Sequence, residues 1–216
     1  RQKISFMALV NIREVYPGVS LGIWDINESV EEMVERFPWT KSLVTEVEHF
    51  KSERRKLEFL VVRELLHEML LQLGISEDRV CELGCISYNS LGKPLLKGYH
   101  VSISHTQGYA AVILSKKHEV AVDIEYVSNR VEKIASKFLR RDERAEGLDS
   151  LLVHWCGKET IYKLFSEEKL QFCEMKVHSF DTMNDWSCEI ENLKSKKKVI
   201  VDFELTMDFV LTYAAL

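Results

Sequence analysis

The stretch EVAVDIEYV, residues 119–127, raises the first question about this chain. Apolar residues stand at every second position from Val120 to Ile124, and this period of two predicts a β-strand beside the core. Asp123 and Glu125 then project from the same face of that strand, about 6.5–7 Å apart. Two like charges on one face of a core strand need water or a cation beside them.

Composition and charge limit the class of protein. The chain has 216 residues, 46% hydrophobic and 29% charged, which is typical of a globular protein with a sizeable core. Its formal net charge of −5 provides no basic field for nucleic acid. No apolar run approaches the roughly 20 residues that cross a bilayer, and no signal peptide opens the sequence. We therefore expect a cytoplasmic protein without membrane contact.

The five cysteines include no CxxC pair and are typical of reduced, mostly buried thiols in a cytosolic protein. Cys81 and Cys85 could share a face if they lay on one strand, but no histidine cluster completes a zinc site with them.

Hydrophobic patterns along the chain predict an α+β protein made of two halves. The clearest helix runs from about residue 52 to 74, with Ser52 as its N-cap and Gly74 at its end. In each half helices come first and strands follow, so we place the halves at 1–116 and 117–216. Further helices are expected at 28–37, 130–139 and 149–166. Strands are expected at 21–26, 100–106, 109–115, 119–127, 173–180, 186–193, 198–205 and 209–215.

Asp123 and Glu125 support two interpretations. Taken alone, the strand favours the simpler one, a sheet edge whose polar face meets water. The other is a divalent-cation site, because Mg²⁺ takes one or two carboxylates and completes its coordination with waters and substrate phosphates. Glu159 is the candidate for a third carboxylate, although Glu159 and Lys163 could equally form an ordinary surface pair at i,i+4.

A second candidate site lies at the end of the strand 100–106. Ser104 and His105 could clamp a phosphate or simply cap the strand end. Neighbours on a strand face opposite sides, and no G-x-S-x-G turn is present, so a Ser–His nucleophilic pair is disfavoured. Basic residues on the helix 52–74 and in the turn 89–94 could receive a polyanion, although each alone is a typical solvated charge. Without a Walker A loop, any phosphates are not held in a glycine-rich cradle.

Four motifs occur in order along the chain: GKP at 92–94, SISH at 102–105, VDIE at 122–125 and WCGKETIYK at 155–163. Together they resemble the 4′-phosphopantetheinyl transferase superfamily, of the type that activates surfactin synthetase. The resemblance implies two pseudo-symmetric α+β halves with the active site in the cleft between them. It also implies Mg²⁺, which Mn²⁺ can replace, and coenzyme A as co-substrate. Ala121 is a departure, since the family commonly has Gly there and a methyl group could narrow the cleft.

The resemblance also carries functional positions onto this sequence. The implied metal ligands are Asp123, Glu125 and Glu159. The implied coenzyme A contacts are Arg63, Lys93, Ser104, His105 and Lys51. Lys163 is expected beside the pyrophosphate. Glu159 is expected to accept the proton of the attacking hydroxyl, and Glu143 is the second candidate for that role.

The implied reaction moves the phosphopantetheine arm of coenzyme A onto a serine of an acyl or peptidyl carrier protein and releases adenosine 3′,5′-bisphosphate, in lipid or secondary-metabolite biosynthesis. Such carriers are acidic, and residues 129–144 hold six basic and three acidic side chains, which makes this segment a candidate docking surface. A solvated amphipathic helix explains the same charges. Since two halves can build one cleft, we expect a monomer.

Two other functions remain open on the sequence. One is a metal-dependent phosphohydrolase that acts on coenzyme A or a nucleotide. The other is a non-catalytic carrier-binding or coenzyme A-binding module.

Overall fold

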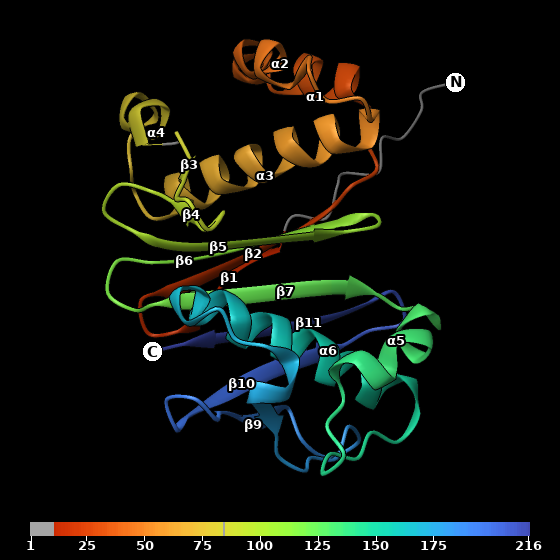
Figure 1. The fold of residues 1–216 in the computed structure, drawn as a ribbon. Helices are drawn as coiled ribbons and strands as arrows, with labels where there is room; N and C mark the ends of the chain where they lie inside the picture. Colours follow the sequence, from red (N-terminus) through yellow and green to blue (C-terminus); the bar gives the residue numbers. More distant parts are fainter. Residues whose placement is uncertain (1–10, 84) are drawn as a thin grey trace.

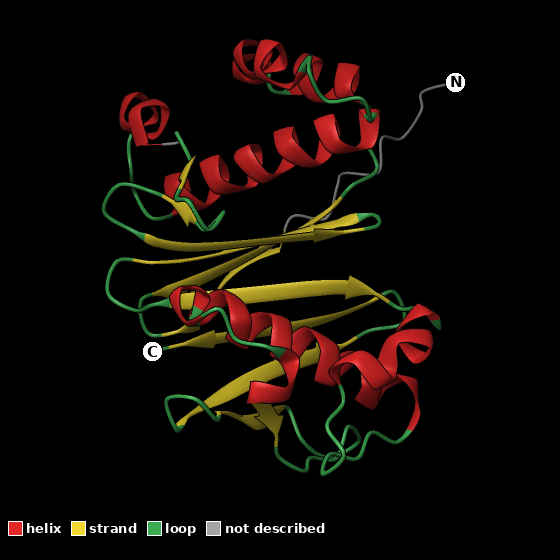
Figure 2. Ribbon diagram, viewed as in Figure 1, coloured by secondary structure: helices red, strands yellow, loops and turns green. Residues whose placement is uncertain are grey.

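The computed structural model describes residues 11–83 and 85–216, and these form four layers: helices, a β-sheet, a second β-sheet and helices again (Figures 1 and 2). The first sheet is antiparallel, with strand order β1-β2-β6-β5. Its strands are β1 (Asn11–Tyr16), β2 (Val19–Asp25), β5 (His100–Thr106) and β6 (Tyr109–Ser115). The remaining elements of this half are α1 (Val30–Arg36), η1 (Pro38–Thr40), α2 (Lys41–Val47), α3 (Glu53–Gln72), α4 (Glu77–Leu83), β3 (Ser87–Tyr88) and β4 (Pro94–Leu95).

The second half forms an antiparallel sheet with strand order β7-β11-β10-β9-β8. Its strands are β7 (Val120–Tyr126), β8 (Met175–Val177), β9 (Ser187–Asn192), β10 (Lys197–Leu205) and β11 (Phe209–Ala215). Its helices are α5 (Arg130–Phe138), α6 (Gly147–Leu164), η2 (Ser166–Glu168) and η3 (Phe172–Glu174). None of the helices within the described residues is long and apolar enough to cross a membrane.

The two halves repeat one plan, and the predicted α+β class is confirmed. In each half a strand (β2 or β7) precedes a long helix that packs on the sheet (α3 or α6). The last strand of the half (β6 or β11) then pairs antiparallel with that strand. The predicted boundary between residues 116 and 117 falls in the turn between β6 and β7.

Helix α3 covers the outer face of the first sheet, as its apolar stripe predicts. Leu60, Leu65 and Met69 are fully buried in a core with β2 and β6. Gly74 follows the helix with φ +78°, a left-handed conformation that favours glycine. Ser52 is the N-cap residue, as predicted, but its side chain makes no capping hydrogen bond within the described residues.

Helix α6 covers the outer face of the second sheet. Cys156 and Ile161 are fully buried there, and Ala121 of β7 lies in the same core. The methyl group of Ala121 therefore packs in the apolar core of this half.

A third core joins the two halves. Leu21 of β2 and Ile113 of β6 pack against Val122 of β7 and Leu211 of β11, and all four side chains are fully buried. Burial of such side chains contributes about 1.5–3 kcal/mol each. The two sheets therefore share one continuous interior.

Edge strands β5 and β7 meet through side-chain hydroxyls. Ser102 Oγ accepts a hydrogen bond from the Val122 N–H at 3.2 Å, and Ser104 Oγ accepts one from the Ile124 N–H at 3.3 Å. Thr106 Oγ1 accepts one from the Tyr126 N–H at 3.3 Å. Alternate hydroxyls on β5 thus satisfy alternate edge amides on β7, which would otherwise be buried without partners.

Two sequence expectations need correction. Helix α4 runs to Leu83 and the strand β3 holds only residues 87–88, so Cys81 and Cys85 do not share a strand. Strand β1 was missed, although the Pro17-Gly18 turn before β2 is a hairpin signal. Of the thiols described, Cys156 and Cys188 are buried, whereas Cys85 and Cys173 are exposed.

Ser102→Ala tests the hydroxyl bridge, because Ser102 is buried and does not touch the carboxylates of β7. The Val122 amide would lose its partner, so we expect a loss of about 1–2 kcal/mol in the free energy of unfolding by urea. Ser87→Ala, at an exposed position in β3, is the control and should change stability by less than about 0.5 kcal/mol. Equal stabilities of the two variants would contradict a bridging role for the hydroxyls.

Candidate active site

Strand β7 brings Asp123 to the boundary between the two sheets. Its side chain is buried, and Oδ1 accepts hydrogen bonds from Ser104 Oγ at 2.8 Å and from Lys163 Nζ at 2.7 Å. The second oxygen, Oδ2, is buried and has no hydrogen-bond partner within the described residues. A buried carboxylate oxygen without a partner is costly, so this atom is suited to bind a cation.

Glu125 lies two residues further along the same face. Its Oε2 accepts from Thr106 Oγ1 at 3.0 Å and its Oε1 accepts from Trp155 Nε1 at 3.3 Å. Burial raises the pKa of Glu125, and the negative charge of Asp123 raises it further. The β5 hydroxyls therefore orient both carboxylates in addition to joining the sheets.

Helix α6 adds Glu159 and Lys163, which lie one turn apart. Burial raises the pKa of Glu159 to about 7, and Asp123 contributes to the rise while Lys163 opposes it. The ammonium group of Lys163 also donates to the carbonyl of Val122 at 2.9 Å. The charges of the three carboxylates therefore influence one another.

The carboxylates of Asp123, Glu125 and Glu159 do not yet form a coordination shell around one point. Among the described residues, their oxygens do not all lie within 4.8 Å of one another. The cation that contacts Asp123 is the Lys163 ammonium. Bringing all three onto one ion requires side-chain rotation, and an ion at Asp123 would compete with Lys163.

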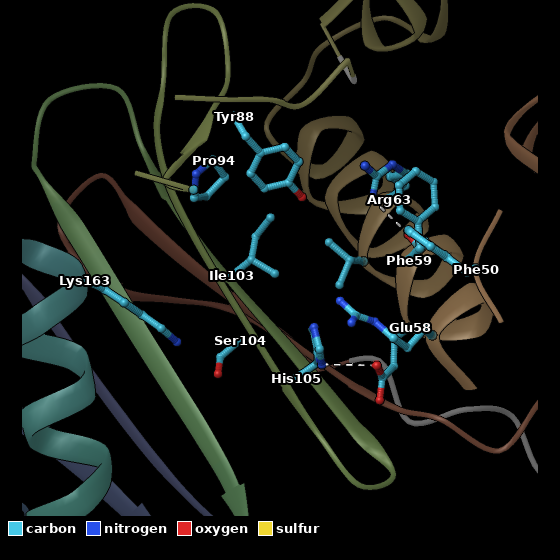
Figure 3. A pocket seen from close by; sticks show the side chains of 13 residues that line it. Phe50, Glu58, Phe59, Arg63, Tyr88, Pro94, Ile103, Ser104, His105 and Lys163 are labelled. Carbon is cyan, nitrogen blue, oxygen red and sulfur yellow. Dashed lines mark hydrogen bonds and ion pairs between the residues drawn. The ribbon is translucent and has the colours of Figure 1, made fainter. Parts of the chain in front are cut away.

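A cavity of about 460 Å³ adjoins these carboxylates, because Ser104 and Lys163 line it and also bind Asp123. In Figure 3, Lys163 points in from α6, Arg63 lies on the opposite side on α3, and Ser104 and His105 lie between them on β5. Its nitrogen-bearing basic residues are Arg55, Arg63, His105 and Lys163, and its aromatic residues are Phe50, Phe59 and Tyr88. Such a lining suits an anionic ligand that also carries a flat ring.

Arg63 and His105 are held in place by α3. The Arg63 guanidinium donates to the carbonyl of Phe59 at 3.2 Å and lies over the Phe59 ring. Burial lowers the pKa of Arg63. His105 Nδ1 lies 3.3 Å from Glu58 Oε2, and burial lowers the pKa of His105 while Glu58 opposes the fall. Both side chains are therefore positioned before any ligand binds.

Lys93 and Lys51, both predicted for the site, do not line the 460 Å³ cavity. Lys93 forms an ion pair with Glu119 at 3.0 Å and lines a smaller adjacent cavity of about 140 Å³, which Lys163 also lines. Lys51 is exposed before α3 and is not among the residues that line the 460 Å³ cavity.

Glu143 belongs to a buried structural ion pair. Its side chain and that of Lys158 are both 0% exposed, with Oε2 2.7 Å from Lys158 Nζ. Glu143 Oε1 accepts from the Val177 N–H at 2.7 Å, and Oε2 also accepts from the Arg140 N–H at 2.8 Å. With both oxygens engaged and no exposure, Glu143 has no access to a substrate, so the expected catalytic role does not fit its surroundings.

Sequence reasoning missed several residues of the site. Thr106 continues the alternation of Ser102 and Ser104, and that period of two was the available signal. Arg55 was visible only as one charge in a basic run, and Glu58 as one residue of a helix. Their roles depend on which face of α3 meets β5, which the tertiary structure decides.

Residues 119–214 match the family model of the 4′-phosphopantetheinyl transferase superfamily. The matched stretch is less than half of the chain, and it is similar to that superfamily, which supports a transfer of phosphopantetheine in general. The match begins at the first residue of EVAVDIEYV and includes Asp123, Glu125, Glu159 and Lys163. A search of curated proteins gave no match.

Because the pKa of Glu159 is raised, we expect the metal-free protein, measured in the presence of a chelator, to lose stability as the pH rises. An acid whose pKa is higher in the folded chain binds more protons when folded, so stability falls as pH rises between the two pKa values. For Glu159 this window runs from about 4.5 to about 7. Glu159→Gln removes the effect, and we expect its free energy of unfolding, relative to the unaltered protein, to be higher at pH 8 than at pH 5 by on the order of 1–3 kcal/mol.

Urea unfolding at the two pH values measures this difference. Asp123→Asn is the companion variant, since removing the charge of Asp123 should lower the pKa of Glu159, as followed by carboxyl NMR. A stability difference that does not change with pH would contradict the prediction.

Proposed function

We propose that this protein transfers the 4′-phosphopantetheine arm of coenzyme A to a serine of an acyl or peptidyl carrier protein, with Mg²⁺ as cofactor and adenosine 3′,5′-bisphosphate as the product released. It is then a phosphopantetheinyl transferase of the holo-[acyl-carrier-protein] synthase type. The observation that carries the proposal is the contact of Ser104 and Lys163 with both Asp123 and the cationic cavity.

The cavity supports coenzyme A as the donor. Its volume of about 460 Å³ is within the usual range of ligand pockets, about 300–1,000 Å³. Arg55, Arg63 and His105 offer donors for the phosphates of a nucleotide. The aromatic rings of Phe59 and Tyr88 offer surfaces for adenine.

The carboxylates support a hard divalent cation. Asp123, Glu125 and Glu159 would hold Mg²⁺, and Mn²⁺ could replace it. The fit rests on Oδ2 of Asp123, which has no hydrogen-bond partner in the described part of the chain, and on the burial and like charges that raise the pKa values of Glu125 and Glu159. When bound, the ion would supply positive charge to the pyrophosphate oxygens.

The protein side chains have separate tasks in this reaction. Lys163 lines the cavity, and its ammonium group would neutralise the leaving phosphate after breaking its ion pair with Asp123. His105, which also lines the cavity, would hold the diphosphate. Glu159 is our choice for the group that accepts the serine proton, since a pKa of about 7 suits a general base near neutral pH. Glu143 is set aside because it is buried with Lys158.

Helix α5 supports carrier docking. Its Val131 and Phe138 are buried, whereas Lys133 and Lys137 are exposed one turn apart. A small cavity of about 170 Å³ lies between α5 and Glu125 and is lined by Arg130, Val131, Ile134, Leu152 and Trp155. An acidic carrier that contacts these lysines would bring its serine arm close to the carboxylates. Arg140 is a poor choice for testing this surface because it is tied to Asp142 and to the Cys173 carbonyl.

The central experiment incubates the protein with coenzyme A, Mg²⁺ and an apo carrier protein and weighs the carrier by mass spectrometry. We expect a mass gain of one phosphopantetheine. Asp123→Ala should lower the rate of transfer more than about 100-fold, because the variant lacks the buried carboxylate that would bind Mg²⁺ and that pairs with Lys163. Circular dichroism should report an intact fold.

Melting temperature supplies the matched control. With coenzyme A present, millimolar Mg²⁺ should raise the melting temperature of the unaltered protein and not that of Asp123→Ala. Cleaved coenzyme A with no carrier mass gain would instead support a phosphohydrolase. An unchanged carrier with intact coenzyme A would support a binding module.

The carrier surface is tested by Lys133→Glu combined with Lys137→Glu. We expect the KM for the carrier to rise roughly tenfold at low salt, while the KM for coenzyme A stays unchanged. Lys41→Glu with Arg79→Glu, at exposed positions on α2 and α4, is the matched charge control. If both double variants raise the carrier KM equally, α5 is not the docking surface.

A further inference from the structure

A second group of potential metal ligands lies on α3, outside the site described above. Glu64, His67 and Glu68 each offer one ligand atom, and these atoms all lie within 4.8 Å of one another. Their spacing of three and four residues places them on one face of the helix. None of the three lines the 460 Å³ cavity, and none is a hydrogen-bond partner of Asp123.

One ring nitrogen of His67 is available to bind a metal ion. Its Nδ1 is buried and has no hydrogen-bond partner within residues 11–83 and 85–216. The ring stacks on Trp39, with centroids 5.0 Å apart and planes at 24°. Stacking fixes the orientation of the imidazole, which lowers the entropy that a ligand must otherwise remove.

Glu64 carries a buried carboxylate that accepts a hydrogen bond from one side chain, that of Trp39. It is only 1% exposed, and its Oε2 accepts a hydrogen bond from Trp39 Nε1 at 2.6 Å. Burial, together with the neighbouring Glu68, raises the pKa of Glu64 to about 7, while the hydrogen bond from Trp39 opposes the rise. The indole donor resembles the outer-shell hydrogen bonds that orient metal-binding carboxylates.

A route to this group exists. A cavity of about 610 Å³ is lined by His67 and Trp39, together with Glu46, Arg63 and Cys85. The segment that carries Trp39 joins α1 to α2 and lies over α3 (Figure 1). An ion entering this cavity would meet the His67 ring.

We propose that Glu64, His67 and Glu68 form a binding site for a divalent transition-metal ion, with Zn²⁺ as the expected occupant. Zn²⁺ takes both imidazole nitrogen and carboxylate oxygen as ligands, and three protein ligands leave a fourth position for water. The nitrogen ligand disfavours Mg²⁺ and Ca²⁺, which take oxygen ligands. The site is independent of the proposed transfer activity, because it shares no ligand with the β7 carboxylates.

The test uses the Asp123→Ala protein, so that the proposed Mg²⁺ site lacks one of its three carboxylates. Equilibrium dialysis should find about one Zn²⁺ per chain. Tryptophan fluorescence should change as Zn²⁺ is added, because Trp39 contacts both His67 and Glu64. Trp39→Phe should remove most of that change while dialysis still finds the ion.

Two half-buried positions provide the variants, since neither substitution empties the core. Adding His67→Gln or Glu68→Gln should weaken Zn²⁺ binding at least about tenfold, with the melting temperature of the metal-free protein little changed. Cys85→Ser is the control for chelation by the exposed thiol and should leave affinity unchanged. Co²⁺ bound in place of Zn²⁺ should give visible absorption that disappears in His67→Gln.

Three results would overturn the site. One is the absence of Zn²⁺ binding to Asp123→Ala at micromolar concentration. Another is unchanged affinity after His67→Gln or Glu68→Gln. The third is loss of binding in Cys85→Ser, which would assign the ion to the thiol. Because every measurement is made without a carrier protein, failure here leaves the transfer proposal untouched.

Discussion

The double use of the hydroxyls on β5 is the constraint on which the rest of this structure depends. Two sheet edges lie side by side without a backbone ladder, so the edge amides of β7 need other acceptors. Ser104 Oγ accepts from the Ile124 amide and donates to the Asp123 carboxylate, and Thr106 does the same for Tyr126 and Glu125. The contact that holds the halves together therefore also orients the carboxylates beside the cavity.

Helix α6 shows how neighbouring residues of one motif take different physical roles. Lys158 is fully buried, where Glu143 and the Phe138 carbonyl compensate its charge, and a buried pair of this kind is costly to break on one side. Glu159, the next residue, turns toward Asp123 and keeps a raised pKa. The buried pair ties α6 to the segment after α5, while Lys163 lines the 460 Å³ cavity. The same helix thus carries a buried structural charge, Lys158, and the two charged residues of the candidate site, Glu159 and Lys163.

Helix α3 has a similar division of faces. Glu58 and Arg63 line the cationic cavity, while Glu64, His67 and Glu68 gather where Trp39 covers the helix. Arg63 lines both this region and the 460 Å³ cavity. The helix therefore places two groups of polar residues on either side of one guanidinium, and each group is supported by an aromatic ring, Phe59 or Trp39.

The sequence alone determined the α+β class, the helix that ends at Gly74 and the candidates Asp123, Glu125, Glu159 and Lys163, because period and spacing are local properties. It also singled out Ser104 and His105 at the end of β5. Only the tertiary structure decided that Glu143 is buried with Lys158, that Lys51 lies outside the cavity and that Thr106 holds Glu125. These depend on which helix faces meet which sheet edges. A residue's neighbours across a layer boundary are set by packing of the whole chain, which no local pattern encodes.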